Sequence, residues 1–171
     1  MTELTRTQRD FRAAMANLSA AVNVITTDGP YGKAGMTVSA ACSVTDSPPT
    51  MLVCVSRSSR SHAVLAGNGR IAVNVLGAGH EELARHFAGA TRVPTEERFA
   101  GGPWDTETHG VPLLLGAPAS VVGRIVADQE LGSHSVLFVE VEAVASSAEH
   151  GALVYFQRRF HSLSREEPCT A

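Results

Sequence analysis

Seven short runs rich in β-branched or apolar residues, most of them bounded by turn signals, constrain the fold of this chain more than any other feature. They occupy residues 21–27, 36–44, 51–55, 71–76, 119–126, 136–144 and 153–156. Runs of this kind predict β-strands. Because strict strand–helix alternation is missing, a doubly wound sheet is disfavoured and a mainly β antiparallel barrel or sandwich is predicted.

Helical patterns are few and short. Phe11, Ala14, Met15 and Leu18 are spaced as one apolar face of a helix. Two short helices are predicted over residues 61–66 and 80–88, each followed by a glycine that stops it. Residues 90–111 predict a long loop of the kind that is often functional. Nothing divides the rest, so residues 1–163 are predicted to form one domain and 164–171 a polar tail.

Composition narrows the classes of partner. The 171-residue chain has a formal charge of −3 and a pI of about 6.1, without the basic surface that nucleic acid or an anionic membrane requires. Residues 1–10 are polar and no apolar signal region follows them. The three cysteines, odd in number and widely spaced, are typical of reduced cytosolic thiols. We therefore expect a cytoplasmic protein that binds neither nucleic acid nor membrane.

Two segments have the residue types of a binding site. Residues 56–62 combine hydroxyls and guanidinium groups just before a predicted helix, which favours an anion site; a solvated loop with Ser59 or Ser61 as helix cap is the alternative. Residues 35–45 alternate small and hydroxyl side chains, against which a flat ring system can lie. The alternative for that segment is an ordinary threonine- and serine-rich strand face.

The sequence does not support a Rossmann-type dinucleotide site, a metal site or a hydrolase site. The glycine patterns at residues 67–72 and 77–82 are interpreted as turns, since the second has Glu81 and Glu82 where a pyrophosphate would bind. His80 and His86 lie six residues apart, off the spacing of helical metal ligands, and no metal site is predicted. No nucleophile elbow or carboxylate pair is present.

Several stretches, in order along the chain, resemble a known family. They are residues 11–15, 18–27, 42–49, 67–69, 73–76, 84–89, 96–99, 132–134 and 155–161. Together they resemble the flavin-reductase-like group, and within it the reductase components of two-component flavin-dependent monooxygenases such as 4-hydroxyphenylacetate 3-monooxygenase. The resemblance covers residues 11–163, nearly the whole chain.

The resemblance implies an FMN-binding split barrel of Greek-key antiparallel strands that forms a homodimer. It implies FAD or FMN as cofactor and NADH as hydride donor. The implied activity is an NADH-dependent flavin reductase. Its free reduced flavin would diffuse to a separate aromatic hydroxylase or monooxygenase.

The same resemblance implies the site residues. The strand over residues 37–43 would face the flavin ring and ribityl chain, and it supplies Thr37, Val38, Ser39, Ala40, Cys42 and Ser43. The loop over residues 56–62 would contact the flavin phosphate through Ser56, Arg57, Ser58, Ser59, Ser61 and His62. Further flavin contacts are expected from Phe87, Arg98, Phe99 and Tyr155. His134 matches a histidine beside the nicotinamide and is the predicted catalytic residue, acting by orientation.

Hydride transfer between two cofactors needs no protein acid or base, because the protein only stacks and orients them. The absence of a nucleophile or carboxylate pair therefore agrees with the implied activity. Two alternatives stay open: a non-enzymatic flavin carrier, and a split-barrel oxidase of the pyridoxamine-phosphate type. Arg57 and Arg60 keep the second alternative open, because it requires added basic residues near the flavin.

Overall fold

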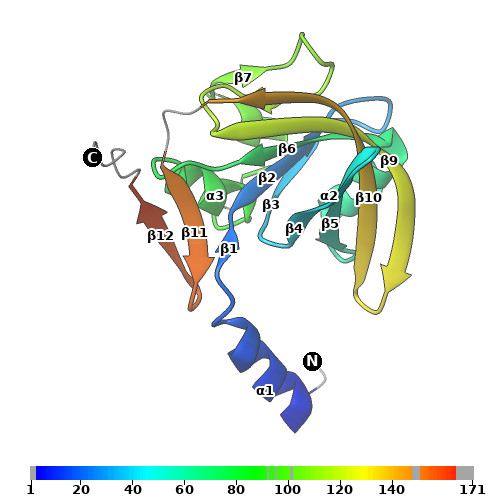
Figure 1. Cartoon of the computed structure of the whole chain (residues 1–171). Coiled ribbons are helices and arrows are strands. Elements are labelled where there is room, and N and C mark those ends of the chain that lie inside the picture. Colours follow the sequence, from blue (N-terminus) through cyan, green and yellow to red (C-terminus); the bar gives the residue numbers. More distant parts are fainter. Residues whose placement is uncertain (1–2, 92, 95, 101, 148–150, 165–171) are drawn as a thin grey trace.

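A computed structural model of the chain describes residues 3–91, 93–94, 96–100, 102–147 and 151–164 (Figure 1). The predicted tail lies outside this range except for Ser164. The elements are α1 (Arg6–Met15), β1 (Ala20–Ala21), β2 (Asn23–Thr27), β3 (Ala34–Val38), β4 (Ala41–Asp46), β5 (Pro49–Ser56), α2 (Arg60–Asn68), β6 (Arg70–Val75), α3 (Glu81–Phe87), the 3-10 helix η1 (Glu96–Phe99), β7 (Trp104–Asp105), β8 (Leu113–Leu114), β9 (Ala119–Leu131), β10 (His134–Ser146), β11 (Ala152–Phe156) and β12 (Arg159–Leu163).

Seven strands form the main sheet, in the order β3-β2-β6-β9-β10-β5-β4. Every neighbouring pair is antiparallel, and the order is not the sequence order, as in Greek-key sheets. The two edge strands, β3 and β4, follow each other in the chain and are joined only by residues 39 and 40. The sheet therefore curls back on itself but stays open between β3 and β4. The predicted mainly β antiparallel fold is confirmed.

The strand predicted over residues 36–44 is wrong in one respect, since the structure divides it into β3 and β4. Val38 of β3 pairs with Asn23 of β2, whereas Ala41 of β4 pairs with Val53 of β5, at the other end of the strand order. The chain leaves one edge at Ser39 and enters the other at Ala41, so no single ladder can include both halves. The predicted loop over residues 90–111 also contains η1 and β7, and β12 was not predicted.

Two apolar clusters hold the sheet and helices together. One lies inside the curled sheet and includes Ile25, Val53, Leu65 and Leu137, all fully buried. The other packs α3 against the start of β2; its members include Val22, Leu76, Ala84, Phe87 and Leu153. Leu65 belongs to α2, whose C-terminus is closed by Gly69 in the left-handed conformation (φ 68°). The two helices are thus fixed on the sheet by buried side chains.

A second, three-stranded sheet has the order β1-β11-β12. Its hairpin turn is tied to the end of α1: the Gln157 N–H donates to the Ala16 carbonyl (2.7 Å), and the Gln157 amide donates to Asn17 Oδ1 (3.2 Å). Helix α1 begins with a capping box in which Thr5 and Gln8 exchange hydrogen bonds. None of its residues is buried, and Figure 1 shows it extending away from the sheets.

An ion-pair network lies on the β6-β9-β10 face. The Glu142 carboxylate accepts from Arg70 Nε (2.8 Å) and from Arg124 Nη2 (3.0 Å), while Arg70 also donates to the His109 carbonyl. The hydrogen bond from Arg70, assisted by the one from Arg124, lowers the pKa of Glu142 below its ordinary value. Among the described residues, no helix has the length and apolar character needed to cross a membrane.

Candidate functional site

The opening between β3 and β4 is the floor of the candidate site. Ser39 and Ala40 are exposed there and have small side chains. The Ala40 carbonyl accepts from the Cys54 N–H (2.9 Å), and the Thr37 hydroxyl donates to the Ala84 carbonyl of α3 (2.7 Å). These bonds hold the ends of both strands, while the side chains between them leave the backbone accessible.

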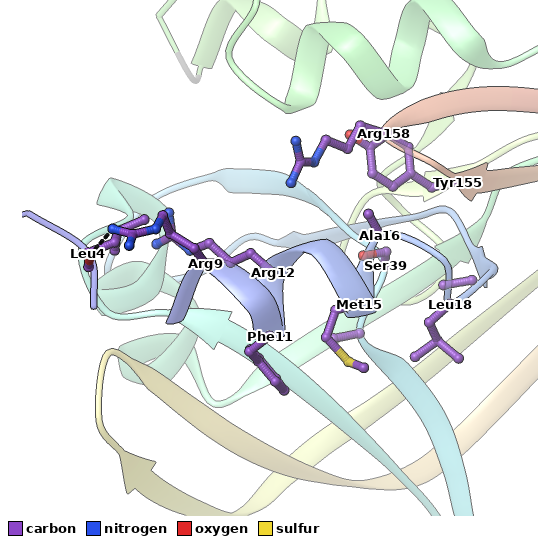
Figure 2. A pocket seen from close by; sticks show the side chains of 12 residues that line it. Leu4, Arg9, Phe11, Arg12, Met15, Ala16, Leu18, Ser39, Tyr155 and Arg158 are labelled. Atoms are coloured by element: carbon purple, nitrogen blue, oxygen red, sulfur yellow. Dashed lines mark hydrogen bonds between the residues drawn. The ribbon is translucent and has the colours of Figure 1, made fainter. Parts of the chain in front are cut away.

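Three pockets lie along this floor, and neighbouring pockets share lining residues; these three pockets together are called the groove. The helix pocket, about 770 Å³, lies between α1 and the β11–β12 turn (Figure 2). The central pocket, about 300 Å³, shares Ser39, Tyr155 and Arg158 with it and continues to α3. The loop pocket, about 530 Å³, shares Thr37 and Ala88 with the central pocket and reaches the start of α2. These volumes lie in the range of small-molecule sites.

Positive charge is concentrated in this groove. Its basic lining residues are Arg9, Arg12, Arg60, Arg85, Arg98 and Arg158. No carboxylate stands among its described lining residues, although the whole chain is acidic. A groove with this lining favours an anionic ligand.

Three of these arginines are already bonded within the protein. Arg85 forms an ion pair with Glu81 (2.7 Å), and Arg9 donates to the Leu4 carbonyl (2.6 Å). Arg98 donates from Nε to the Val93 carbonyl (3.1 Å), which fixes the segment that bounds the loop pocket. The side chains of Arg12, Arg60 and Arg158 have no hydrogen bond or ion pair with the residues that the structure describes, which leaves these three cations free for a ligand.

The segment over residues 56–62 divides between the groove and the protein interior. Ser59 caps α2 by accepting from the Ser61 N–H (3.2 Å), as the alternative interpretation held, and the Ser61 hydroxyl donates to the Gly35 carbonyl (3.1 Å). Both nevertheless line the loop pocket. Ser56 and Ser58 bond to each other through their hydroxyls (3.0 Å), outside all three pockets.

Arg57 and His62 point to other partners. Arg57 forms an ion pair with Glu130 of β9 (2.8 Å). His62 Nε2 lies 2.9 Å from the hydroxyl of Ser135, which is fully buried on β10. Neither residue lines the groove. Of the two guanidinium groups in this segment, that of Arg60 lines the loop pocket and that of Arg57 does not.

The remaining predicted residues fall into two groups. The groove is lined by Thr37, Val38, Ser39, Ala40, Phe87, Arg98 and Tyr155. Cys42 and Ser43 are exposed on β4 beyond it, and Phe99 packs edge-on against Phe87 (ring centroids 5.1 Å apart) behind it. Their assignment to the flavin stays a prediction.

His134 begins β10 directly opposite Ser56, so the structure brings the predicted catalytic residue beside the predicted phosphate loop. Its Nδ1 lies 2.9 Å from the Ser133 hydroxyl, and the side chain is exposed. It does not line the groove of this single chain. No group of three histidine, cysteine, aspartate or glutamate side chains able to hold a metal occurs in the part of the chain that the structure describes.

Sequence reasoning did not assign several residues that line the groove, among them Arg12, Arg85, Arg158 and Phe160. The last two lie on the β11–β12 hairpin, whose turn is formed by Gln157 and Arg158. That turn lacks the Asn-Gly or Asp-Gly pair by which short hairpins are recognised, so β12 and its side chains gave no signal.

Comparison with known proteins agrees with this architecture. A family model described as a flavin reductase like domain matches residues 15–164. The reductase component of 4-hydroxyphenylacetate 3-monooxygenase from Pseudomonas aeruginosa is 53% identical over 163 residues, which cover 95% of this chain and 96% of that protein. The FMN reductase (NADH) RutF of Ancylobacter novellus is 50% identical over 157 residues, covering 92% of this chain and 86% of that protein.

Solved structures show the same fold. The NADH:FAD oxidoreductase SgcE6 of Streptomyces globisporus, in complex with NAD and FAD fragments, superimposes with a TM-score of 0.83 and 29% identity, covering the whole of both chains. This agreement in fold, the family match over most of the chain and the identity to the two bacterial reductases lead to one conclusion. The chain belongs to the flavin reductase-like domain family.

Proposed function

We propose that this protein is an NADH-dependent flavin reductase that supplies reduced flavin to a separate oxygenase. The observation that carries the proposal is the arginine-lined groove, free of carboxylates among its described residues, whose floor is the small-residue gap between β3 and β4. Relatives that are 50% and 53% identical to this chain are a named FMN reductase (NADH) and a named monooxygenase reductase component.

The groove fits a flavin in two respects. Ser39 and Ala40 offer a flat surface without bulky side chains, against which an isoalloxazine ring can lie. The loop pocket offers the free Arg60 guanidinium and the hydroxyl of Ser59 to a phosphate. A flavin held by these residues would supply the redox chemistry of hydride transfer from NADH. The protein residues would bind the two substrates and orient them.

His134 is proposed to orient the nicotinamide. Its Nδ1 is within hydrogen-bond distance of Ser133, so Nε2 on the exposed side of the ring is available to the carboxamide. His134 lies beside the loop over residues 56–62 and does not line the groove of one chain. Orientation of this kind raises the rate without any proton transfer.

A homodimer is proposed on the basis of α1. Phe11 and Met15 of α1, together with Leu18 beyond its C-terminal end, are apolar and 62%, 45% and 65% exposed. A second copy that covers these side chains would add a wall to the helix pocket, which Phe11, Met15 and Leu18 line. Light scattering tests the proposal: a monomer with full activity would contradict it.

We propose a cytoplasmic setting and diffusive transfer of the reduced flavin. Cys42 and Cys54 are free thiols, as expected in a reducing compartment. Ser39, Ala40 and Arg60 of the groove are exposed, which favours dissociation of the reduced flavin.

The test is NADH consumption with FAD, FMN and riboflavin compared side by side. We expect NADH oxidation only in the presence of a flavin, with NADPH much poorer. A protein that binds flavin but leaves NADH untouched would be a carrier, and the proposal would be wrong.

A further inference from the structure

The turn between β11 and β12 holds an arginine in an unusual backbone conformation. Gln157 (φ 48°) and Arg158 (φ 60°) both lie in the left-handed region, which glycine and asparagine adopt more readily. They are the only non-glycine residues with positive φ among those described. A hairpin that requires this conformation gains nothing from arginine in its backbone, so the reason for arginine lies in its side chain.

The Gln157 side chain has a structural role, whereas that of Arg158 has none. Gln157 ties the turn to the end of α1 through Ala16 and Asn17. Arg158 is exposed and forms no hydrogen bond or ion pair with any described residue. Figure 2 shows its side chain extending from the hairpin beside the helix pocket, with the apolar side chains of α1 on the opposite side of the helix.

Arg158 lines both the helix pocket and the central pocket, so it stands where the two join. The other free cation of the helix pocket is Arg12 on α1. Half-buried Tyr155 also lines both pockets, and the Phe160 ring packs against it at a tilt of 60° (ring centroids 5.2 Å apart). Cations next to aromatic rings, with no carboxylate among the described lining residues, suit a phosphate joined to a nucleoside.

The position of Arg158 along the groove indicates which phosphate its side chain would bind. The proposed flavin places its own phosphate in the loop pocket with Arg60, at the opposite end of the groove from the helix pocket. The helix pocket, about 770 Å³, is then free for the second substrate. We propose that Arg158 binds the diphosphate of NADH and that the helix pocket holds the adenosine half. This assignment rests on the proposed flavin reductase function.

The test compares Arg158→Gly with Arg159→Ala. Glycine adopts the left-handed conformation without strain, so the first variant removes the guanidinium and keeps the turn. Arg159 is the adjacent exposed arginine and does not line the groove, which makes it a control for net charge. Riboflavin serves as flavin substrate because it has no phosphate of its own.

We expect Arg158→Gly to raise the apparent KM for NADH about fivefold, the effect of losing about 1 kcal/mol from one charge-assisted contact at an exposed site, with the KM for riboflavin kept. Arg159→Ala should leave both constants near those of the parent. Equal NADH constants in parent and Arg158→Gly, or equal losses in both variants, would overturn the assignment. Weaker FAD binding with an unchanged KM for NADH would also overturn it, in favour of the flavin's adenosine half.

Calorimetry with ADP-ribose separates this inference from the proposed activity. ADP-ribose carries the diphosphate and adenosine but undergoes no redox chemistry. If the parent oxidises no NADH, the proposed function is wrong, yet weaker ADP-ribose binding to Arg158→Gly would still support a diphosphate site at this turn. Equal ADP-ribose affinity in parent and variant would refute the site whatever the activity.

Discussion

Arg60 is predicted to supply the positive charge for the flavin phosphate, and Arg57 is not. Both belong to the same loop and both are exposed, but Arg57 is bonded to Glu130 at 2.8 Å whereas Arg60 lines the loop pocket without a described partner. A shielded charge-assisted hydrogen bond contributes about 1.5–3 kcal/mol, and an exposed ion pair about 0.2–1 kcal/mol. For the exposed Arg60 we therefore expect about 1 kcal/mol, which corresponds to about a fivefold change in Kd.

The assay is titration of flavin fluorescence with the parent, Arg60→Ala and Arg57→Ala. FMN should bind about fivefold more weakly to Arg60→Ala, and within about twofold of the parent to Arg57→Ala. Riboflavin should bind equally to all three proteins, since it lacks the phosphate. The reasoning would be refuted by an equal loss for riboflavin, or by a loss of FMN affinity in Arg57→Ala alone.

Three further predictions concern the framework and the nicotinamide. Gly123→Ala would place a Cβ against the Glu140 carbonyl oxygen and should lower the free energy of unfolding by about 2–3 kcal/mol in urea titrations. Gly79 has open space around it, so Gly79→Ala should unfold like the parent. Similar urea midpoints for the two variants would contradict this prediction. Because the folded-state pKa of Glu142 is lowered, its ion pairs stabilise the protein at neutral pH, and this contribution disappears as the pH falls through that pKa. Glu142→Gln should therefore lower the free energy of unfolding by about 1 kcal/mol at pH 7 and leave it unchanged in acid. A difference in unfolding free energy that does not depend on pH would exclude this mechanism. His134→Ala should raise the KM for NADH and slow reduction of bound flavin in stopped-flow experiments while flavin affinity stays normal, and reduction at the parent rate across the NADH range would remove the proposed role.

The strands were predictable from the sequence because a run of apolar residues by itself indicates a buried segment. Runs such as residues 71–76 lie in the core, with Ile71 and Leu76 fully buried. The division at Ser39 and Ala40 was not predictable, because alternation along one strand does not say which neighbour each half pairs with. That choice is made by Val53 on β5 and Asn23 on β2, which are distant in sequence and approach only when the sheet curls.

The candidate site was predictable in composition and less so in detail. The segment over residues 56–62 combined an anion site with a helix cap, and the structure assigns Ser59 to the cap and leaves Arg60 free at the pocket. Which arginine was free depended on Glu130, a residue of a distant hairpin. Likewise the apolar stripe of α1 was visible in the sequence, but periodicity indicates only that a face is apolar and does not identify what covers it.

The exposure of the groove is consistent with the release that the proposed transfer requires. A reductase that hands over free flavin must hold it long enough for hydride transfer and then let it dissociate. Arginines such as Arg12, Arg60 and Arg158 attract anions over a distance but contribute little to tight binding, because solvent screens them. Solvent does not screen the hydrogen bonds within the protein that hold the groove, from the Thr37 hydroxyl to the Ala84 carbonyl and from the Ser61 hydroxyl to the Gly35 carbonyl. The fold thus keeps the shape of the groove rigid while its contacts with an anionic ligand stay weak, and such a combination favours turnover over retention.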